Sequence, residues 1–320
     1  MPKRLKCAVI GVGKMGINHV RVYASIPQVK FVGIGEVNKT LGEKVASQYG
    51  LNHYTDYKDL IMAEQPDLVS ICVPTSFHYQ VASYFLRKNI NILLEKPIAT
   101  TVDEAKALVA LAKKYKTSLL VGHIERFNPA VKKVKQIINS GKIGKVTSII
   151  ARRVGGFPFQ IRDANIMVDL AIHDLDIVNY LLDSLPQVVT VSKHRIHTKT
   201  REDSVEYFLQ YKNTSAYIQS NWITPVKIRK LLITGSEGYL ELDYITQKIE
   251  FYKSNYDKFK EETKGFSDFI LKFSSSDRQI ISVAKKEPLT EEIKYFINKV
   301  ASNEQVVSQF AVEALKIALT

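Results

Sequence analysis

Short apolar runs alternate with amphipathic stretches through the first third of the chain, a pattern typical of a parallel α/β sheet. The runs are rich in Val, Ile and Leu, and they cover residues 6–10, 31–36, 68–73, 92–94 and 118–122. The stretches between them keep helical spacing, and one begins with a Thr-x-x-Glu capping box at Thr101. This alternation predicts a doubly wound parallel sheet.

The pattern changes after Gly122, where strand-like runs follow one another with few helices between them. These runs cover residues 145–153, 188–193, 204–211, 214–222, 228–234, 239–244 and 248–252. Residues 235–238, Gly-Ser-Glu-Gly, have the composition of a hairpin turn. Successive strands of this kind favour a mostly antiparallel sheet.

We therefore predict an α/β chain with two domains, a Rossmann dinucleotide-binding domain over residues 1–122 and an α+β domain over 123–320. Two helical patterns, 288–301 and 306–319, are assigned to the second domain by their place in the chain, and residues 256–286 show no clear pattern. The second pattern almost reaches Thr320, which leaves open whether the native chain continues.

Composition supports a globular protein of this size, since 45% of the 320 residues are hydrophobic and 24% are charged. No run of 18 apolar residues and no signal peptide are found, so neither a membrane nor export is predicted. Cys7 and Cys72 lie in apolar runs, as expected of buried thiols in a reducing cytoplasm. The net charge of +13 comes from scattered lysines without interleaved aromatic clusters, which argues against nucleic acid and favours an anionic small molecule.

A G-x-G-x-x-G sequence joins the first strand to the first helix. Such a turn lets a dinucleotide pyrophosphate approach the backbone and the helix N-terminus. The residues expected to contact the cofactor here are Gly11, Gly13, Lys14, Met15 and Gly16. Glu36 ends the next strand, 20 residues after Gly16, where a carboxylate binds ribose hydroxyls and repels a 2′-phosphate. This spacing predicts NAD rather than NADP.

Two further turns should lie at the same carboxyl edge of the sheet, where ligands bind in open α/β folds. After the run 68–73, the residues expected to line the cofactor are Val73, Pro74, Thr75 and His78. The run 92–94 ends in Glu95-Lys96-Pro97, and Pro97 biases Lys96 away from helical geometry. We predict that Lys96 lies against the nicotinamide ring and contacts the oxygen of the carbon being oxidised. The alternative is an ordinary surface turn.

A second cluster, Asp169-Leu-Ala-Ile-His-Asp-Leu-Asp176, falls on a helix in the second half of the chain. Asp169 and His173 are four residues apart and should share a face near the helix start. The helix dipole disfavours a charged imidazole there, so His173 is a candidate general base and Asp169 would orient it. An acidic helix start with an incidental histidine is the alternative. No metal site is predicted, because no second histidine lies nearby in the sequence.

Three arginines are candidates for binding a diphosphate or a sugar, since a bidentate guanidinium suits phosphate. They are Arg126, Arg153 and Arg162. Solvated surface arginines are the alternative for each.

The glycine turn, Glu95-Lys96-Pro97 and Asp169-xxx-His173, in this order, resemble the Gfo/Idh/MocA oxidoreductase family over essentially the whole chain. The resemblance implies NAD(P)-dependent oxidation of sugar-like alcohols, with Lys96 and His173 as the catalytic pair and Asp169 beside them. It implies that Glu95 contacts the nicotinamide ribose. It also implies a large open sheet in the second domain that forms the interface of a homo-oligomer, either a dimer or a tetramer.

Three segments are similar to one subgroup of that family, the UDP-N-acetylglucosamine 3-dehydrogenases. They are residues 122–129, residues 169–176, and Trp-Ile-Thr-Pro at 222–225 followed by Lys-Ile-Arg at 227–229. The similarity implies oxidation at C3 of a UDP-N-acetylhexosamine. An inositol or free-sugar dehydrogenase, an NAD-dependent glycoside-cleaving enzyme and a non-catalytic NAD-binding protein remain as alternatives. Neither the exact sugar nor the choice between dimer and tetramer follows from the sequence.

Overall fold

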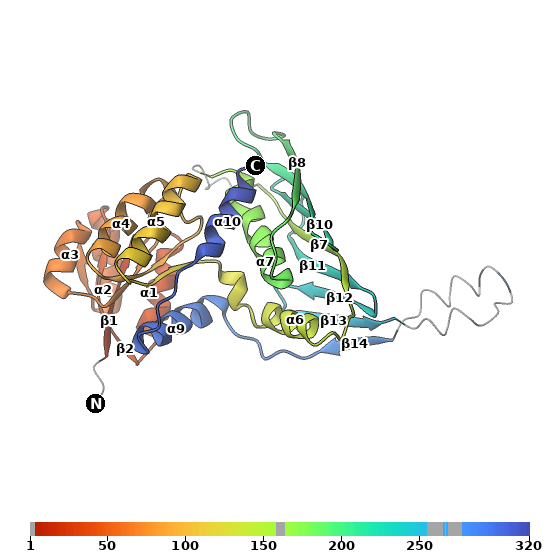
Figure 1. Ribbon diagram of the computed structural model, residues 1–320. Helices are drawn as coiled ribbons and strands as arrows, with labels where there is room; N and C mark the ends of the chain where they lie inside the picture. Colours follow the sequence, from red (N-terminus) through yellow and green to blue (C-terminus); the bar gives the residue numbers. More distant parts are fainter. Residues whose placement is uncertain (1–3, 158–163, 255–264, 266, 268–276) are drawn as a thin grey trace. The chain divides into compact units, whose positions relative to one another are not determined.

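The computed structural model describes residues 4–157, 164–254, 265, 267 and 277–320, and the chain divides into two compact units (Figure 1). The first unit comprises Met1–Ile124 and Glu287–Leu319, and the second comprises Glu125–Lys286 with Thr320. In the described part of the chain, no helix is both long enough and apolar enough to cross a lipid bilayer.

The first unit is built on a parallel six-stranded sheet in the order β3-β2-β1-β4-β5-β6. Its strands are β1 (Leu5–Ile10), β2 (Val29–Gly35), β3 (Asn52–Tyr54), β4 (Leu68–Ile71), β5 (Asn91–Leu94) and β6 (Leu119–Val121). The chain winds outward from β1 through β2 and β3, then returns to β4 and winds the other way, as the sequence predicted. Only β3 was not among the apolar runs, because its three residues are half buried or exposed.

Helices connect these strands: α1 (Gly16–Ala24), α2 (Lys39–Tyr49), α3 (Tyr57–Glu64), α4 (His78–Arg87) and α5 (Val102–Lys114), with a 3₁₀ turn η1 (Thr75–Phe77) before α4. Their starts are set by local sequence. Asn38 accepts the Leu41 N–H at the start of α2, and the predicted capping box forms between Thr101 and Glu104 at the start of α5. The central strands are closed to solvent on both faces, as parallel sheets usually are.

The two C-terminal helices, α9 (Pro288–Ala301) and α10 (Gln309–Ala318), belong to the first unit. The assignment of the whole range 123–320 to the second domain therefore needs correction. The chain before α10 lies along the edge strand β6, where Leu119 donates its N–H to the carbonyl of Val306 at 2.7 Å. The returning chain thus satisfies backbone groups that the edge strand would otherwise expose.

The second unit holds an eight-stranded sheet in the order β14-β13-β12-β11-β7-β10-β9-β8. Its strands are β7 (Val146–Val154), β8 (Val188–His194), β9 (Ser204–Gln210), β10 (Ser215–Asn221), β11 (Ile228–Gly235), β12 (Gly238–Asp243), β13 (Lys248–Lys253) and β14 (Arg278–Ile281). Every pairing is antiparallel except that of β7 with β10. The predicted hairpin joins β11 to β12, with Gly235 opposite Gly238.

Helices α6 (Pro129–Asn139) and α7 (Ile172–Leu182) pack on one face of this sheet (Figure 1). A 3₁₀ turn, η2 (Ile124–Phe127), precedes α6, and a π-helical segment, η3 (Met167–Ala171), leads directly into α7. Side chains alternate along β7, so that Ile149 and Ala151 are buried while Ile150 and Arg152 are exposed. The sheet therefore has one face packed against helices and one face of exposed residues.

Candidate active site

The glycine turn leaves almost no space for side chains at two of its three glycines. A Cβ on Gly16 would lie 1.9 Å from the Gly11 carbonyl oxygen, and one on Gly11 would lie 2.8 Å from the Cys72 oxygen. Gly11 also has a φ of 82°, which L residues rarely adopt. Gly13 is open, since a Cβ added there would meet nothing within 4 Å. The turn is thus tight at both ends and open at its middle glycine, as an approaching pyrophosphate requires.

Glu36 lies beside this turn. Its carboxylate accepts N–H groups from Val12 and Asn38, both at 2.9 Å. The predicted ribose-binding carboxylate and the glycine turn therefore come together at the carboxyl edge of the sheet. Lys14 is exposed at the turn and Met15 is half-buried just before α1.

The turn after β4 lies against the glycine turn, because Gly11 approaches the backbone of Cys72 and Val73. His78 is buried at the start of α4, with Nδ1 2.7 Å from the Pro97 oxygen and Nε2 2.9 Å from the Val73 oxygen. Burial lowers its pKa, against the opposing effect of these carbonyls. A neutral ring donates one proton, so it serves one carbonyl at a time. His78 thus ties the turn after β4 to the segment after Lys96.

Glu95 is a buried carboxylate at the end of β5, and 9% of its surface is exposed. Its Oε1 lies 3.0 Å from His19 Nε2, and its Oε2 accepts the Lys96 N–H at 3.2 Å. Burial alone would raise its pKa. The hydrogen bond and charge of His19, followed by the Lys96 charge and peptide N–H, outweigh burial and lower the pKa below its usual range. Lys96 is therefore held at the strand end, next to a fixed negative charge.

In the second unit, Asp169 and His173 lie on opposite sides of a change in helical pitch. Asp169 belongs to the π-helical segment η3, and His173 is the second residue of α7. The predicted single α-helix with ideal four-residue spacing is therefore wrong, because a π turn holds more residues than an α turn. Just before the segment, the Asn165 carbonyl accepts the Asp169 N–H at 3.0 Å, and the Asn165 side-chain oxygen accepts the Val168 N–H at 3.2 Å. Both Asp169 and His173 are half-buried, and π segments occur frequently at functional sites.

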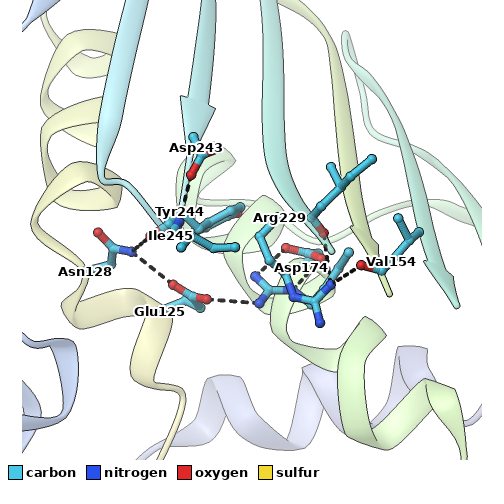
Figure 2. A network of polar contacts seen from close by, with 10 residues as sticks. Glu125, Asn128, Val154, Asp174, Arg229, Asp243, Tyr244 and Ile245 are labelled. Carbon is cyan, nitrogen blue, oxygen red and sulfur yellow. Dashed lines mark hydrogen bonds and ion pairs between the residues drawn. The ribbon is translucent and has the colours of Figure 1, made fainter. Parts of the chain in front are cut away.

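Two of the three candidate arginines are held in ion pairs with α7. Arg126 binds Asp176 through Nε and Nη2, both at 2.7 Å. Arg153 binds Asp174 through Nε at 2.8 Å and Nη2 at 3.0 Å, and its Nη1 reaches Glu125 at 3.0 Å (Figure 2). The Arg153 contacts hold α7 on strand β7, and the Arg126 contacts hold it to the turn η2. Arg162 lies outside the described residues.

Arg229, on β11, lies beside this network in Figure 2. Its Nη1 donates to the Val154 oxygen at 2.6 Å and to the Ile228 oxygen at 2.9 Å. Burial, followed by the like charge of Arg153, lowers its pKa to about 10, while Asp174 and Asp169 act in the opposite direction. The Asp169 carboxylate thus shares one electrostatic environment with the buried arginines.

Sequence reasoning missed two buried residues of the first unit. His19, on α1, is fully buried and contacts Glu95. Glu292, on α9, is fully buried, and neither carboxylate oxygen has a hydrogen-bond partner among the described residues. The only sequence signal for His19 was its place on the apolar face of a helix. For Glu292 no signal existed, since the fold alone brings α9 against α1 and β5.

Comparison with known proteins defines the class: residues 5–123 match the model of the NAD-binding Rossmann fold of an oxidoreductase family. Residues 131–241 match the C-terminal domain of the same family. The chain therefore belongs to the Gfo/Idh/MocA oxidoreductase family, as the sequence resemblance indicated, and its cofactor is NAD.

Relatives include several sugar dehydrogenases. The chain is 26% identical to the UDP-N-acetylglucosamine 3-dehydrogenase of Acidithiobacillus ferrooxidans, over 94% of this chain and 90% of that protein. It is 31% identical to the scyllo-inositol 2-dehydrogenase (NAD⁺) of Bacillus subtilis, over 61% of this chain and 58% of the relative. A solved structure of the Acidithiobacillus ferrooxidans enzyme matches with a TM-score of 0.84, covering 98% of this chain and 95% of the other.

Proposed function

We propose that the protein is an NAD-dependent dehydrogenase that oxidises a sugar ring hydroxyl, most specifically C3 of a UDP-N-acetylhexosamine. The observation that carries the proposal is the strand end at Glu95 and Lys96. There a buried carboxylate fixes the segment from which Lys96 emerges, at the edge of the sheet that holds the glycine turn. The UDP-N-acetylglucosamine 3-dehydrogenase relative, similar over almost the whole chain, supports the finer assignment.

The cofactor contacts that we propose follow the geometry of the first unit. The open position at Gly13 and the start of α1 accommodate a pyrophosphate, and the Glu36 carboxylate next to that turn can accept ribose hydroxyls. The remaining proposed contacts are Gly11, Lys14, Met15, Gly16, Val73, Pro74, Thr75, His78, Glu95 and Lys96. The contacts of His78 with two backbone carbonyls favour a supporting role for it.

In the proposed reaction, Lys96 and His173 both act on the substrate hydroxyl. His173 removes the hydroxyl proton, Lys96 stabilises the negative charge that develops on the same oxygen, and the carbon–hydrogen bond breaks with its electron pair. Bound NAD supplies the acceptor for this hydride. Asp169 orients His173 and stabilises the imidazolium that forms. General-base and electrostatic contributions of this kind each provide roughly 10²- to 10⁴-fold in rate.

The role proposed for the arginines changes with the contacts that they make. Arg153 is buried, and Asp174 and Glu125 bind three of its nitrogen atoms, which supports a structural role in holding α7. Arg126 is similarly bound to Asp176 through two nitrogens. We therefore propose that both act on the sugar nucleotide chiefly through the position of α7, and Arg162 stays a candidate for direct contact.

We also propose that the protein is a cytoplasmic homo-oligomer assembled through the exposed face of the eight-stranded sheet. Phe208, Tyr217, Ile150 and Leu232 are successive partners across four neighbouring strands. The first three are 47%, 38% and 39% exposed. A continuous apolar row of this kind is a recurrent feature of protein–protein interfaces. The two cysteines are unpaired, which suits a reducing compartment.

The test measures how fast the Lys96→Ala and His173→Ala variants oxidise UDP-N-acetylglucosamine. The rate is read from the increase in NADH absorbance. Both variants should lose activity by at least 10²-fold while NADH still binds. Matched controls are Lys106→Ala on α5 and His194→Ala on β8, which replace exposed residues of the same types. Activity near that of the wild type in either active-site variant would eliminate the proposed role.

An inositol or free-sugar dehydrogenase is the second candidate, favoured by the 31% identity to the scyllo-inositol enzyme. A panel of polyols, free sugars and UDP-sugars, compared by kcat/KM, separates the two. An NAD-dependent glycoside-cleaving enzyme, which oxidises its substrate only transiently, would consume substrate without net formation of NADH. A flat response across the whole panel would favour a non-catalytic NAD-binding protein.

A further inference from the structure

His19 links two elements that converge on the cofactor edge of the first unit. It lies on α1, one turn after Gly16, and is fully buried. Its Nε2 lies 3.0 Å from Glu95 Oε1, and within the described residues Nδ1 has no hydrogen-bond partner. Within the described residues, the side-chain hydrogen bonding of His19 is therefore confined to the Glu95 carboxylate.

The Glu95 carboxylate is confined on its other sides as well. The Lys96 N–H contacts Oε2 at 3.2 Å. A Cβ on Gly122 would lie 3.3 Å from both carboxylate oxygens, so the absence of a side chain there leaves only enough space for the carboxylate. The carboxylate is thus held between α1, the end of β5 and the residue after β6.

We propose that His19 is a positioning residue for NAD: by holding the Glu95 carboxylate, it fixes the strand end that carries Lys96 relative to the phosphate-binding helix α1. The physical reason is that α1 begins at Gly16 of the glycine turn, and that Lys96 lies two residues after β5 ends at Leu94. The two ends of a dinucleotide would contact these two elements, so a rigid connection between them preorganises the site and reduces the free-energy cost of binding.

The charge environment of Glu95 makes this connection sensitive to pH. The titratable groups that face it are His19 from α1, Lys96 from its own strand end, Cys72 after β4, His78 from α4 and Glu292 from α9. Among the groups that favour the ionised carboxylate, His19 has the largest effect on the pKa of Glu95. Without His19, burial would dominate and Glu95 would keep its proton to higher pH.

The test measures NADH affinity by fluorescence titration from pH 6 to pH 9, which requires no sugar substrate. His19→Leu should raise the Kd about tenfold or more at pH 6, the effect expected when a buried carboxylate loses its charge-assisted hydrogen bond. The deficit should shrink as pH rises, because Glu95 then ionises without His19. His19→Gln, which retains an N–H donor, should recover part of the affinity.

Tyr23→Phe is the matched control. Tyr23 lies on the same helix, is 1% exposed, and would lose one buried hydrogen bond, to Ser70 Oγ at 3.0 Å. It should change stability but leave NADH affinity within about twofold at every pH. Wild-type affinity in His19→Leu, or a pH-independent deficit that Tyr23→Phe reproduces, would overturn the proposal.

A second measurement covers the outcome in which His19→Leu does not fold. In a Glu95→Gln background, His19→Gln should cause no further loss of NADH affinity, because the ionised partner is already absent. Fully additive losses would contradict the proposal. Gly122→Ala, which places a Cβ 3.3 Å from the same carboxylate oxygens, should weaken NADH binding with His19 intact. Since each readout is NADH binding, a failure of the proposed sugar oxidation would leave this test unaffected.

Discussion

Replacing Glu292 with glutamine should reduce the dependence of the stability of the first unit on pH. Glu292 is fully buried on α9, and no described residue forms a hydrogen bond with its carboxylate oxygens. Burial, and then the negative charge of Glu95, raise its pKa well above the usual range. The folded protein therefore holds a proton on Glu292 at pH values where the unfolded chain has released it.

The sign and size of the effect follow from proton linkage. Below the pKa of Glu292 in the unfolded chain, about 4.3, both states are protonated and folding has no pH-dependent cost from this group. Above that pH, the unfolded state binds fewer protons, so the unfolding free energy falls by about 1.4 kcal/mol per pH unit until the raised pKa is reached. Each pH unit over which the folded protein keeps this proton thus corresponds to about 3–6 °C in Tm for a unit of this size.

Thermal unfolding of the wild type and of Glu292→Gln at pH 5, 6 and 7 measures the difference directly. Titratable groups that both proteins share, such as His78, contribute equally to the two Tm values and cancel in the difference. The Tm advantage of the variant should increase with pH. Two parallel curves for the wild type and Glu292→Gln would refute the reasoning, because they would mean that Glu292 titrates alike in both states.

Three further predictions concern the cofactor turn and the ion-pair network. Glu36→Ala removes the carboxylate that would repel a 2′-phosphate, so the ratio of kcat/KM for NADP to that for NAD should rise at least tenfold, and an unchanged ratio would contradict the assignment. Asp174→Asn leaves the buried guanidinium of Arg153 without its bidentate partner and should lower the unfolding free energy by about 3–5 kcal/mol in urea titrations. Gly16→Ala places a Cβ 1.9 Å from a carbonyl oxygen and should abolish NADH binding or folding, whereas Gly13→Ala, which meets nothing within 4 Å, should retain the fold.

Local patterns were sufficient for most of the first unit. A capping box, an apolar run ended by proline and a glycine turn depend on neighbouring residues, so Thr101, Pro97 and Gly11 could be interpreted from the sequence alone. The strand β3 was missed because its residues carry no apolar period. The π-helical segment at Asp169 was also missed, since a change of helical pitch depends on packing and leaves no mark on residue spacing.

Charged side chains were the least predictable features. Arg126 and Arg153 have the chemistry of phosphate ligands, and the sequence offered no way to see that Asp176 and Asp174 would bind them. The same holds for His19 and Glu95, which are 76 residues apart in the chain. A partner across such a separation is chosen by the topology of the sheet, and topology is not a local property.

The sequence by itself determined most of the elements, the doubly wound order, the cofactor turn and the residue types available for catalysis, because these depend on periodicity and on neighbours in the chain. Only the tertiary structure decided that α9 and α10 complete the first unit and that a buried histidine holds Glu95 at the end of β5. Burial is the physical reason: removing water fixes which polar groups must pair, and three-dimensional packing alone decides which groups lose their water.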